Sequence, residues 1–327
     1  MTRAEAITAF LAHHDFSQAH LLPLAQDASF RRYWRITGGP HPAILMDAPP
    51  PEDIRAFVRI AEHLAALGLS SPKIHATDEK FGLLLEEDFG NALYATVLTP
   101  ENTGELLDAA ADALVVMHTA PPPPGLPRWD AEAMTQTALG TLMDWWWPAM
   151  FGTQAPDAAR QDFFHALQKM LAPLARVEKF VHRDFIAGNL VWLPQRTGPR
   201  RAGLLDFQSA ALGHPAYDLA SLTQDARRDI SPASAERAIA RYLAARPELS
   251  GKEFRAAITI CAAQRHLRVS GQWVRLARRD GKPHYLAHGP RSWALLNAAL
   301  STPETAPLAA AMDRWIPPAN RKNPPPA

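Results

Sequence analysis

Two short polar patterns in the second half of the chain have the residue types and spacing that phosphoryl transfer requires. The first, at 182–189, reads His-Arg-Asp-Phe-Ile-Ala-Gly-Asn, and the second, at 204–207, reads Leu-Leu-Asp-Phe. Phosphoryl transfer needs a carboxylate beside the accepting hydroxyl, and Asp184 suits that role. It also needs oxygen ligands for Mg²⁺, which Asn189 and Asp206 supply at the required spacing. A lone His-Arg-Asp or Asp-Phe would mean little, but five specified residues in order favour a catalytic site.

Short apolar segments on either side of these patterns indicate the strands that position them. Residues 180–181 lead into the first pattern, 190–192 follow it, and 203–205 lead into the second. Apolar runs with polar residues at both ends predict a strand–loop–strand hairpin. Such a hairpin would bring the three polar side chains to one edge of a small sheet.

The composition is that of an ordinary globular protein. The chain has 327 residues, of which 47% are hydrophobic and 20% charged, which predicts one large domain or two lobes. The net charge of +1 makes no case for a nucleic acid or an anionic membrane as partner. No apolar run reaches the length of a membrane span, and the first residues lack the apolar core of a signal peptide. The single cysteine, Cys261, cannot form an internal disulfide, so we expect a cytoplasmic protein.

The N-terminal region is expected to cover a nucleotide. A helix is predicted over 2–22, followed by strands over 26–36 and 43–47 that a Gly-Gly-Pro turn joins. Backbone N–H groups near Ser29 and Phe30 are candidates for cradling phosphate groups. On these residues alone, a solvated hairpin with surface arginines is the alternative.

A helix and a buried strand complete this region. Residues 52–67 carry apolar side chains at helical spacing and end at a glycine, which suits a helix C-terminus. The strand that begins near Leu83 ends in three acids, Glu86, Glu87 and Asp88. Their backbone is where a hinge segment would meet the edge of adenine. A plain strand end would read the same way, so both interpretations stand.

The remainder of the chain reads as mainly helical. Its most basic stretch, 264–282, places arginines among apolar residues at roughly helical spacing, so most of these arginines are expected on a solvated face. No aromatic-rich basic patch extends it into a nucleic-acid site. Asp218 is expected to support the catalytic loop, and His118 to pack or cap at a helix end. The proline-rich residues 317–327 are expected to form a disordered tail.

These patterns together resemble the aminoglycoside phosphotransferase/choline kinase-like superfamily. The catalytic loop, the Asp206 segment and the turn at 213–218 carry this resemblance. Further stretches are similar to those of the anomeric cell-wall sugar kinases, which phosphorylate C1 of N-acetylmuramate and N-acetylglucosamine. These stretches are 27–33, 44–50, 83–90, and 264–267 with 279–282. The resemblance extends over residues 25–295.

The resemblance implies an α+β, bilobal protein-kinase-like fold. A small β-rich N-lobe over 1–89 would cover the nucleotide, and a larger, mostly helical C-lobe over 90–316 would hold the catalytic and substrate-binding residues. The resemblance implies MgATP as the donor and a sugar 1-phosphate as the product, for peptidoglycan recycling. Asp184 matches the base of the family, and Asn189 and Asp206 match its metal ligands.

One departure from the wider kinase pattern concerns the phosphate-binding lysine. Its strand position holds Met46 in this chain, a feature that the anomeric kinases share. Another cation must then reach the ATP phosphates. Neighbouring residues on a strand point to opposite faces, so only one of Arg31 and Arg32 can do so, and we expect Arg32.

The acceptor is expected to be a small amino sugar, with neither nucleic acid nor membrane as partner. The lactyl carboxylate of N-acetylmuramate needs a cation or N–H donors, and Arg265 is the candidate. The nearest alternative is an aminoglycoside, choline or homoserine-like acceptor on the same fold, although a cationic acceptor would want an acidic site. A non-catalytic nucleotide-binding regulator is a further alternative, which the intact catalytic set disfavours. Stimulation of MgATP consumption by N-acetylated amino sugars would separate these functions.

Overall fold

The computed structural model describes residues 1–24, 31–50, 52–175 and 177–325. They form two compact units. Unit 1 consists of Met1–Val97 and Gly188–Ser209, and unit 2 of Leu98–Ala187 and Ala210–Ala327. The units differ from the expected lobes chiefly in the segment Gly188–Ser209, which belongs with the N-terminal residues. Ser29 and Phe30, the candidates for cradling phosphate, lie outside the described residues.

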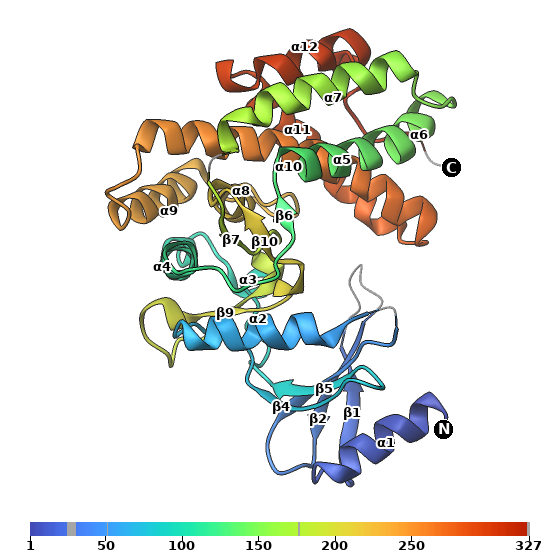
Figure 1. Cartoon of the computed structure of the whole chain (residues 1–327), viewed down its shortest axis with the longest axis vertical. Coiled ribbons are helices and arrows are strands. Elements are labelled where there is room, and N and C mark those ends of the chain that lie inside the picture. Colours follow the sequence, from blue (N-terminus) through green and yellow to red (C-terminus); the bar gives the residue numbers. More distant parts are fainter. Residues whose placement is uncertain (25–30, 51, 176, 326–327) are drawn as a thin grey trace. The chain divides into compact units, whose positions relative to one another are not determined.

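Unit 1 is built on a five-stranded sheet in which every neighbouring pair of strands is antiparallel (Figure 1). In spatial order the strands are β1 (His20–Pro23), β2 (Arg32–Thr37), β3 (Ala43–Asp47), β5 (Leu83–Glu87) and β4 (Ile74–Asp78). The central strand β3 is buried along its whole length. A strand that is apolar on both faces must be covered on both faces, and one helix lies on each side of this sheet.

Helix α1 (Arg3–His13) covers one face of this sheet. Its apolar side chains pack with alternate residues of the strands, as the period of two along a strand requires. That core consists of Ala6, Phe10, Leu11, Phe16, Ile36, Ala43, Leu45, Leu83 and Leu85. The face of the sheet that carries Leu45 is therefore the α1 face, and Met46 points to the other one.

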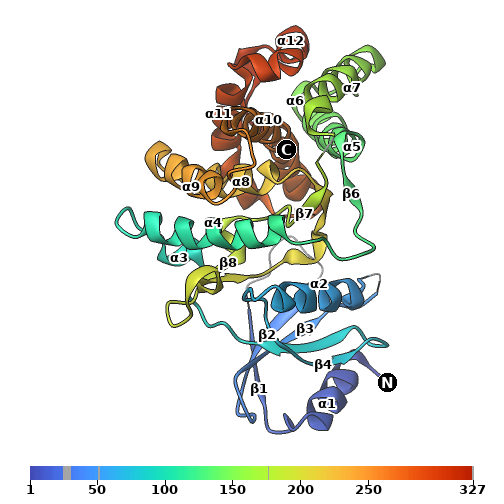
Figure 2. The same cartoon turned by 60° about the vertical axis from the view of Figure 1, so that its left-hand side comes forward.

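Helix α2 (Ile54–Ala66) lies on the opposite side of the sheet from α1 (Figures 1 and 2). Asp53 caps it by accepting a hydrogen bond from the backbone N–H of Arg55 at 2.9 Å. It ends at Gly68, whose φ of +76° favours glycine. Phe57 packs on Phe207, with 4.6 Å between ring centroids, and so α2 is tied to the segment that follows the second catalytic pattern.

The catalytic hairpin, between the two patterns, forms as the sequence predicted; Asp184 belongs to unit 2, so its meeting with Asn189 and Asp206 at one edge stays a prediction. Strand β8 (Leu190–Trp192) pairs with β9 (Ala202–Leu204) in antiparallel register, and Leu190 stands opposite Leu204. Short helical turns flank these strands: Ala187–Asn189, Gly198–Arg201 and Phe207–Ser209, with the one-turn helix α3 (Tyr94–Val97) packed against β8. The polar ends of the two strands are thereby brought to one place within unit 1.

Unit 2 is mainly helical and has one small sheet. That sheet contains β6 (Arg128–Trp129), β10 (Ala211–Gly213) and β7 (Lys179–Val181), in this order. The helices are α4 (Thr103–Thr119), α5 (Ala131–Thr141), α6 (Trp147–Phe151), α7 (Asp157–Leu171), α8 (Ala216–Thr223), α9 (Pro232–Ala244), α10 (Gly251–Arg279), α11 (Gly289–Leu300) and α12 (Ala306–Trp315). A π-helical turn, Leu142–Trp146, joins α5 to α6, and 3₁₀ turns are formed by Ala172–Leu174, Pro283–His288, Pro303–Thr305 and Pro318–Asn320.

Helix α10 is the centre of unit 2, where it contacts α5, α8 and α11 (Figure 2). Its close approach to the end of α5 depends on Gly271. A Cβ atom there would lie 2.4 Å from the backbone carbonyl of Thr141, a distance that real Cβ atoms do not reach. The glycine in mid-helix therefore costs helix propensity but allows close packing.

Two local expectations differ from the structure. Residues 20–23 form the short edge strand β1, although a helix was predicted through 22. Residues expected to be a disordered tail pack on unit 2: the indole Nε1 of Trp146 donates to the carbonyl of Lys322 at 2.9 Å.

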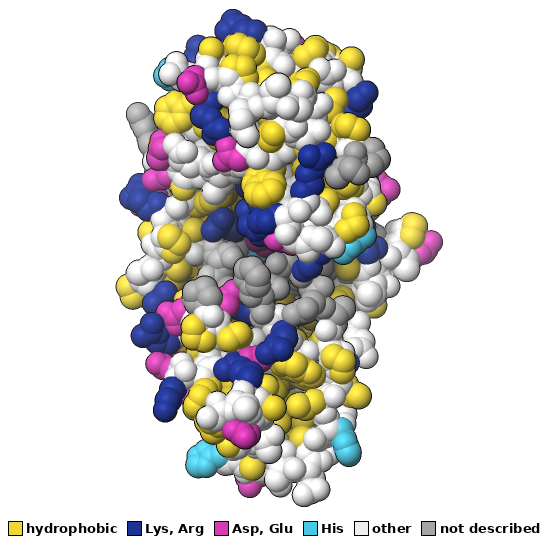
Figure 3. Space-filling view, turned by 90° about the vertical axis from the view of Figure 1, so that its right-hand side faces the viewer, with side chains coloured by type: hydrophobic (Ala, Val, Ile, Leu, Met, Phe, Trp, Pro, Cys, Tyr) yellow, Lys and Arg dark blue, Asp and Glu magenta, His cyan; other side chains and the backbone are white. Residues whose placement is uncertain are grey.

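The surface has no single dominant charge. On the face drawn in Figure 3, Lys and Arg side chains stand among Asp and Glu side chains, in keeping with the net charge of +1. Within the described ranges, no helix is long and apolar enough to cross a membrane.

Candidate active site

Unit 1 brings Asn189 and Asp206 together. The β8–β9 ladder is extended by one bond, in which the backbone N–H of Leu205 donates to the carbonyl of Asn189 at 3.0 Å. The next residue, Asp206, has a φ of +58°, which turns its side chain back towards the hairpin. As a result, the Asn189 Nδ2 lies 3.4 Å from Asp206 Oδ2. These are the two predicted metal ligands, and their adjacency suits one shared cation.

The surroundings of Asp206 fit a hard divalent cation. Gln208 donates from Nε2 to Asp206 Oδ1 at 2.6 Å, while its own Oε1 is buried with no hydrogen-bond partner among the described residues. Amide and carboxylate oxygens are the ligands that Mg²⁺ prefers, usually one or two of them with phosphate and water completing the octahedron. The described residues contain no group of three His, Cys, Asp or Glu side chains placed to hold a metal. Two neighbouring oxygen ligands of this kind suit a cation that also binds phosphate.

Unit 2 holds the other half of the catalytic loop through Asp218. This carboxylate is fully buried; its Oδ2 accepts from the backbone N–H of His182 at 2.7 Å, and its Oδ1 from that of Arg183 at 2.9 Å. The imidazole Nε2 of His118 lies 3.3 Å from Oδ2, and Tyr242 contacts the other ring nitrogen. The predicted roles of Asp218 as a support and of His118 as a packing residue are confirmed.

Asp184 lies next to this support, in a strongly cationic environment. Its carboxylate is 3.7 Å from the guanidinium of Arg265 and keeps 37% of its side chain exposed. Desolvation by the surrounding protein raises the pKa of this carboxyl, but neighbouring cations outweigh that effect and hold the pKa below its ordinary value. In order of effect they are Arg268, Arg265, Arg183 and His182. Asp184 is therefore an ionised hydrogen-bond acceptor and a weak base.

The arginines of α10 were expected on a solvated face, and the structure shows otherwise for those nearest Asp184. Arg265 is only 3% exposed, and Arg268 and Arg275 are partly buried, whereas Arg278 and Arg279 are exposed. The reason is that α10 runs through the centre of unit 2, so that one side of its polar stripe faces the catalytic loop. Whether Arg265 contacts an acceptor carboxylate stays a prediction.

Arg32 does not have the orientation expected from the sequence. It stands opposite Asp47 on β3, and its guanidinium is 2.6 Å from the buried Asp47 carboxylate, on the α1 face of the sheet. Arg3 of α1 binds the same carboxylate. Strand alternation alone left open which arginine faces which way. The orientation follows from the α1 face of the sheet, because the Asp47 carboxylate on that face is a partner for Arg32.

Arg31 instead lies on the Met46 face. It is 8% exposed, pairs with Glu52 at 2.6 Å, and its charge acts on Tyr33, which stands opposite Met46. Arg31 is therefore a cation on the side of the sheet where a kinase carries its lysine. A contact with phosphate stays untested for either arginine.

The three acids at the end of β5 are in three different environments. Glu86 is buried on the Met46 face, and burial raises its pKa to about 8. Glu87 pairs with Arg196 at 2.5 Å, and Asp88 with Arg35 at 2.5 Å. The backbone N–H of Glu87 donates to Lys73, so the ladder occupies it. A hinge contact to adenine by these residues stays a prediction.

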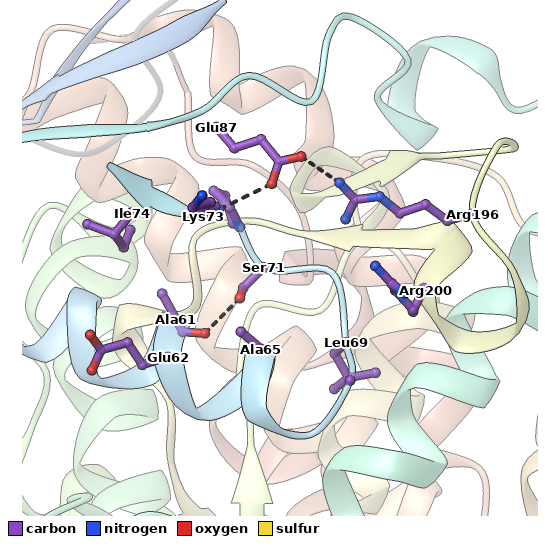
Figure 4. A pocket seen from close by; sticks show the side chains of 12 residues that line it. Ala61, Glu62, Ala65, Leu69, Ser71, Lys73, Ile74, Glu87, Arg196 and Arg200 are labelled. Carbon is purple, nitrogen blue, oxygen red and sulfur yellow. Dashed lines mark hydrogen bonds and ion pairs between the residues drawn. The ribbon is translucent and has the colours of Figure 1, made fainter. Parts of the chain in front are cut away.

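A hollow of about 510 Å³ in unit 1 lies apart from this chemistry. Figure 4 shows Arg196 reaching Glu87 across it, next to Arg200. Its lining is Ala61, Glu62, Ala65, Gly68, Leu69, Ser71, Pro72, Lys73, Ile74, Glu87, Arg196 and Arg200. None of these belongs to the catalytic patterns. At this hollow, the ion pair between Glu87 and Arg196 joins the end of β5 to the β8–β9 connection.

Sequence reasoning missed two side chains of the site. Gln208 follows the second pattern by one residue, and only its contact with Asp206 identifies it. Arg268 is three residues after Arg265, so the two share a helix face, and that spacing was a usable signal.

Comparisons with known proteins indicate the family of this chain. The model of the phosphotransferase enzyme family matches residues 20–251. A protein of Caulobacter vibrioides named N-acetylmuramate/N-acetylglucosamine kinase is 36% identical, over 98% of this chain and 98% of that protein. One of the same name from Pseudomonas aeruginosa is 36% identical, over 89% of this chain and 87% of its own length.

The fold expected from the sequence is confirmed by a solved structure. A choline/ethanolamine kinase family protein from Mesorhizobium loti superimposes with a TM-score of 0.65 at 17% identity, covering 96% of this chain and 100% of that one. Its likeness shows the fold alone, the α+β protein-kinase-like fold. With the family match over most of the chain, the catalytic pattern and this fold lead to one conclusion: the chain belongs to the phosphotransferase enzyme family and is a kinase.

Proposed function

We propose that this protein is an ATP-dependent kinase that phosphorylates the C1 hydroxyl of N-acetylmuramate, N-acetylglucosamine or both, and acts in the cytoplasm in peptidoglycan recycling. The observation that carries the proposal is the 36% identity, over 98% of the chain, to a protein named N-acetylmuramate/N-acetylglucosamine kinase. The ionised Asp184 and the adjacent pair Asn189 and Asp206 supply the chemistry that such a reaction needs.

Asp184 would orient the anomeric hydroxyl and accept its proton late in the transfer. A carboxylate whose pKa is lowered is a weak base, and this suffices because the transition state is loose and depends mainly on positioning. Asn189 and Asp206 would hold Mg²⁺, which when bound neutralises charge on the phosphates. In this proposal the β-rich unit covers the nucleotide, with Arg31 as its phosphate-side cation, and the helical unit binds the sugar.

The cationic surroundings of Asp184 disfavour the alternative acceptors. Choline and aminoglycosides are cations, and they would meet Arg183, Arg265 and Arg268 around the catalytic carboxylate. Like charges in a partly desolvated site repel strongly. A neutral or anionic sugar is the acceptor that this site favours.

The direct test is a panel of acceptors incubated with MgATP. It should contain N-acetylmuramate, N-acetylglucosamine, choline, homoserine and an aminoglycoside, with products identified by mass and by NMR. We expect a phosphate on C1 of an N-acetylated amino sugar and none on the cationic acceptors. Phosphorylation of a cationic acceptor alone, or of nothing in the panel, would refute the proposal.

A further inference from the structure

Arginines form a stripe along one side of α10 that begins at the catalytic carboxylate. Successive residues of an α-helix are about 100° apart around its axis. By this spacing the stripe spans about 80° and consists of Arg265, Arg268, Arg275 and Arg279. Arg265 contacts Asp184 at 3.7 Å, and the charge of Arg268 acts on the same carboxylate. Arg183 adds a further cation from the loop and stacks on Trp129 at 3.8 Å.

Arg268 forms no ion pair of its own with a carboxylate in the described part of the chain, and neither does Arg275. The one hydrogen bond of Arg268 among these residues, at 3.5 Å, goes to the hydroxyl of Tyr217. The Arg268 Nε is buried and has no partner among the described residues, and the same is true of Arg275 Nε. Arg265 Nε is likewise without a partner among the described residues, but its Nη1 contacts Asp184 and the carbonyl of Arg183.

Arg183, Arg265 and Arg268 share the one negative charge of Asp184, and this excess of positive charge indicates an anionic ligand. Taking a cation out of water is costly unless it is paired, and a planar guanidinium binds a carboxylate through two parallel hydrogen bonds. Arg268 is only partly covered, so a ligand can reach it. Because Asp184 is the residue beside the accepting hydroxyl, an anion that reaches the stripe belongs to the acceptor, several bonds from the reacting hydroxyl.

We propose that Arg268, with Arg275 next along the stripe, binds the carboxylate of an acidic amino sugar and makes N-acetylmuramate the preferred acceptor over N-acetylglucosamine. This inference rests on the function proposed above. Arg268 is then the specificity residue, whereas Arg265 is a positioning residue that holds Asp184. The carboxylate that Arg265 was expected to bind is assigned to its neighbour one turn further along the helix.

The test compares kcat/KM for the two sugars in the wild-type protein and in Arg268→Gln. Because Arg268 also acts on Asp184, the readout is the ratio of the two values: we expect kcat/KM for N-acetylmuramate to fall by about 10–100-fold more than that for N-acetylglucosamine, the effect of losing one charge-assisted contact with the carboxylate. Arg278→Gln is the matched control, because it removes the same charge from the exposed side of α10. It should leave both values unchanged.

A ligand-side experiment makes the test independent of how well the variant folds. The methyl ester of N-acetylmuramate lacks the carboxylate charge, so the wild-type protein should lose about the same 10–100-fold with it, and Arg268→Gln should no longer distinguish ester from acid. Equal wild-type activity on acid and ester would overturn the inference and leave the proposed function standing. An equal loss on both sugars in Arg268→Gln would overturn it in favour of a role that does not involve the lactyl carboxylate, exerted on Asp184 or on the phosphoryl group. No transfer to either sugar by the wild-type protein would refute the proposed function itself.

Discussion

The Asp218→Asn substitution tests whether the buried support under the catalytic loop sets the rate. In the structure one carboxylate oxygen accepts from the N–H of His182 at 2.7 Å, and the other accepts from that of Arg183 at 2.9 Å. An asparagine amide has one oxygen and one NH₂ group. One of the two backbone N–H groups would therefore face another donor in a site where water is excluded.

The size of the effect follows from that lost bond. A hydrogen bond to a charged acceptor contributes about 1.5–3 kcal/mol, and the other bond becomes a neutral one, so we expect the free energy of unfolding to fall by about 2–4 kcal/mol. If about 2–3 kcal/mol of this loss falls on the loop conformation that holds Asp184, kcat drops by about 30–150-fold. KM for ATP should change little, because Asn189 and Asp206 belong to unit 1.

The assay measures kcat and KM at a temperature where the variant is folded, together with the midpoint of urea unfolding. Asp108→Asn is the matched control. Asp108 is a buried acid on α4, outside the catalytic loop, and its carboxylate accepts a hydrogen bond from Arg237 at 2.6 Å. It should lose stability and keep kcat. The reasoning fails if Asp218→Asn keeps kcat within about threefold of wild type, or if both variants lose kcat equally.

Four further outcomes are expected. Asp206→Ala should abolish transfer while the protein stays folded, and near-normal activity at saturating Mg²⁺ would remove it from the metal site. Asp184→Asn should lower kcat by about 10²-fold or more with ATP affinity retained; a collapse in ATP affinity alone, measured by calorimetry, would make it a nucleotide or metal ligand. Arg31→Ala should raise KM for ATP or lower kcat while Arg32→Ala leaves both unchanged in steady-state assays, and the reverse order would contradict the orientation described above. The pKa of Glu86 is raised from 4.5 to about 8, so the stability of the wild-type protein should decline as pH rises from 4.5 through 8. The urea midpoint of Glu86→Gln should lack that decline. Identical dependence of the two urea midpoints on pH would show that Glu86 is not a buried neutral acid.

The catalytic hairpin could be predicted because its signals are local. Apolar residues flank polar ones over a few positions at 190–192 and 202–204, and that alternation needs no distant partner to be read. The edge strand β1 was missed because four residues, His20–Pro23, follow directly after a helix and carry no clear period of their own. Its strand conformation comes from pairing with β2, which is a tertiary effect.

The orientation of charged side chains could not be predicted in the same way. Alternation along β2 shows that Arg31 and Arg32 face opposite sides, but the Asp47 carboxylate on the α1 face determines which side each takes. Helical spacing likewise groups Arg265 with Arg268, but only the position of α10 between α5, α8 and α11 shows that this stripe is partly buried. Both errors concern which face of an element is covered, and that depends on residues far away in the sequence.

Backbone strain occurs in both catalytic patterns. Among the described residues, Asp15, Arg183 and Asp206 are the non-glycine residues with positive φ, and two of these stand in the catalytic patterns. Such a conformation costs on the order of 1–3 kcal/mol and persists only where the surroundings enforce it. For Arg183 the enforcing contacts are the bond from its N–H to Asp218 and the stacking on Trp129; for Asp206 they are Asn189 and Gln208. Each unit thus holds one residue out of its preferred backbone region: Arg183, next to Asp184 in the sequence, and Asp206, a predicted metal ligand. Such strain is expected if the fold holds the predicted base and the predicted metal ligand each in a fixed conformation.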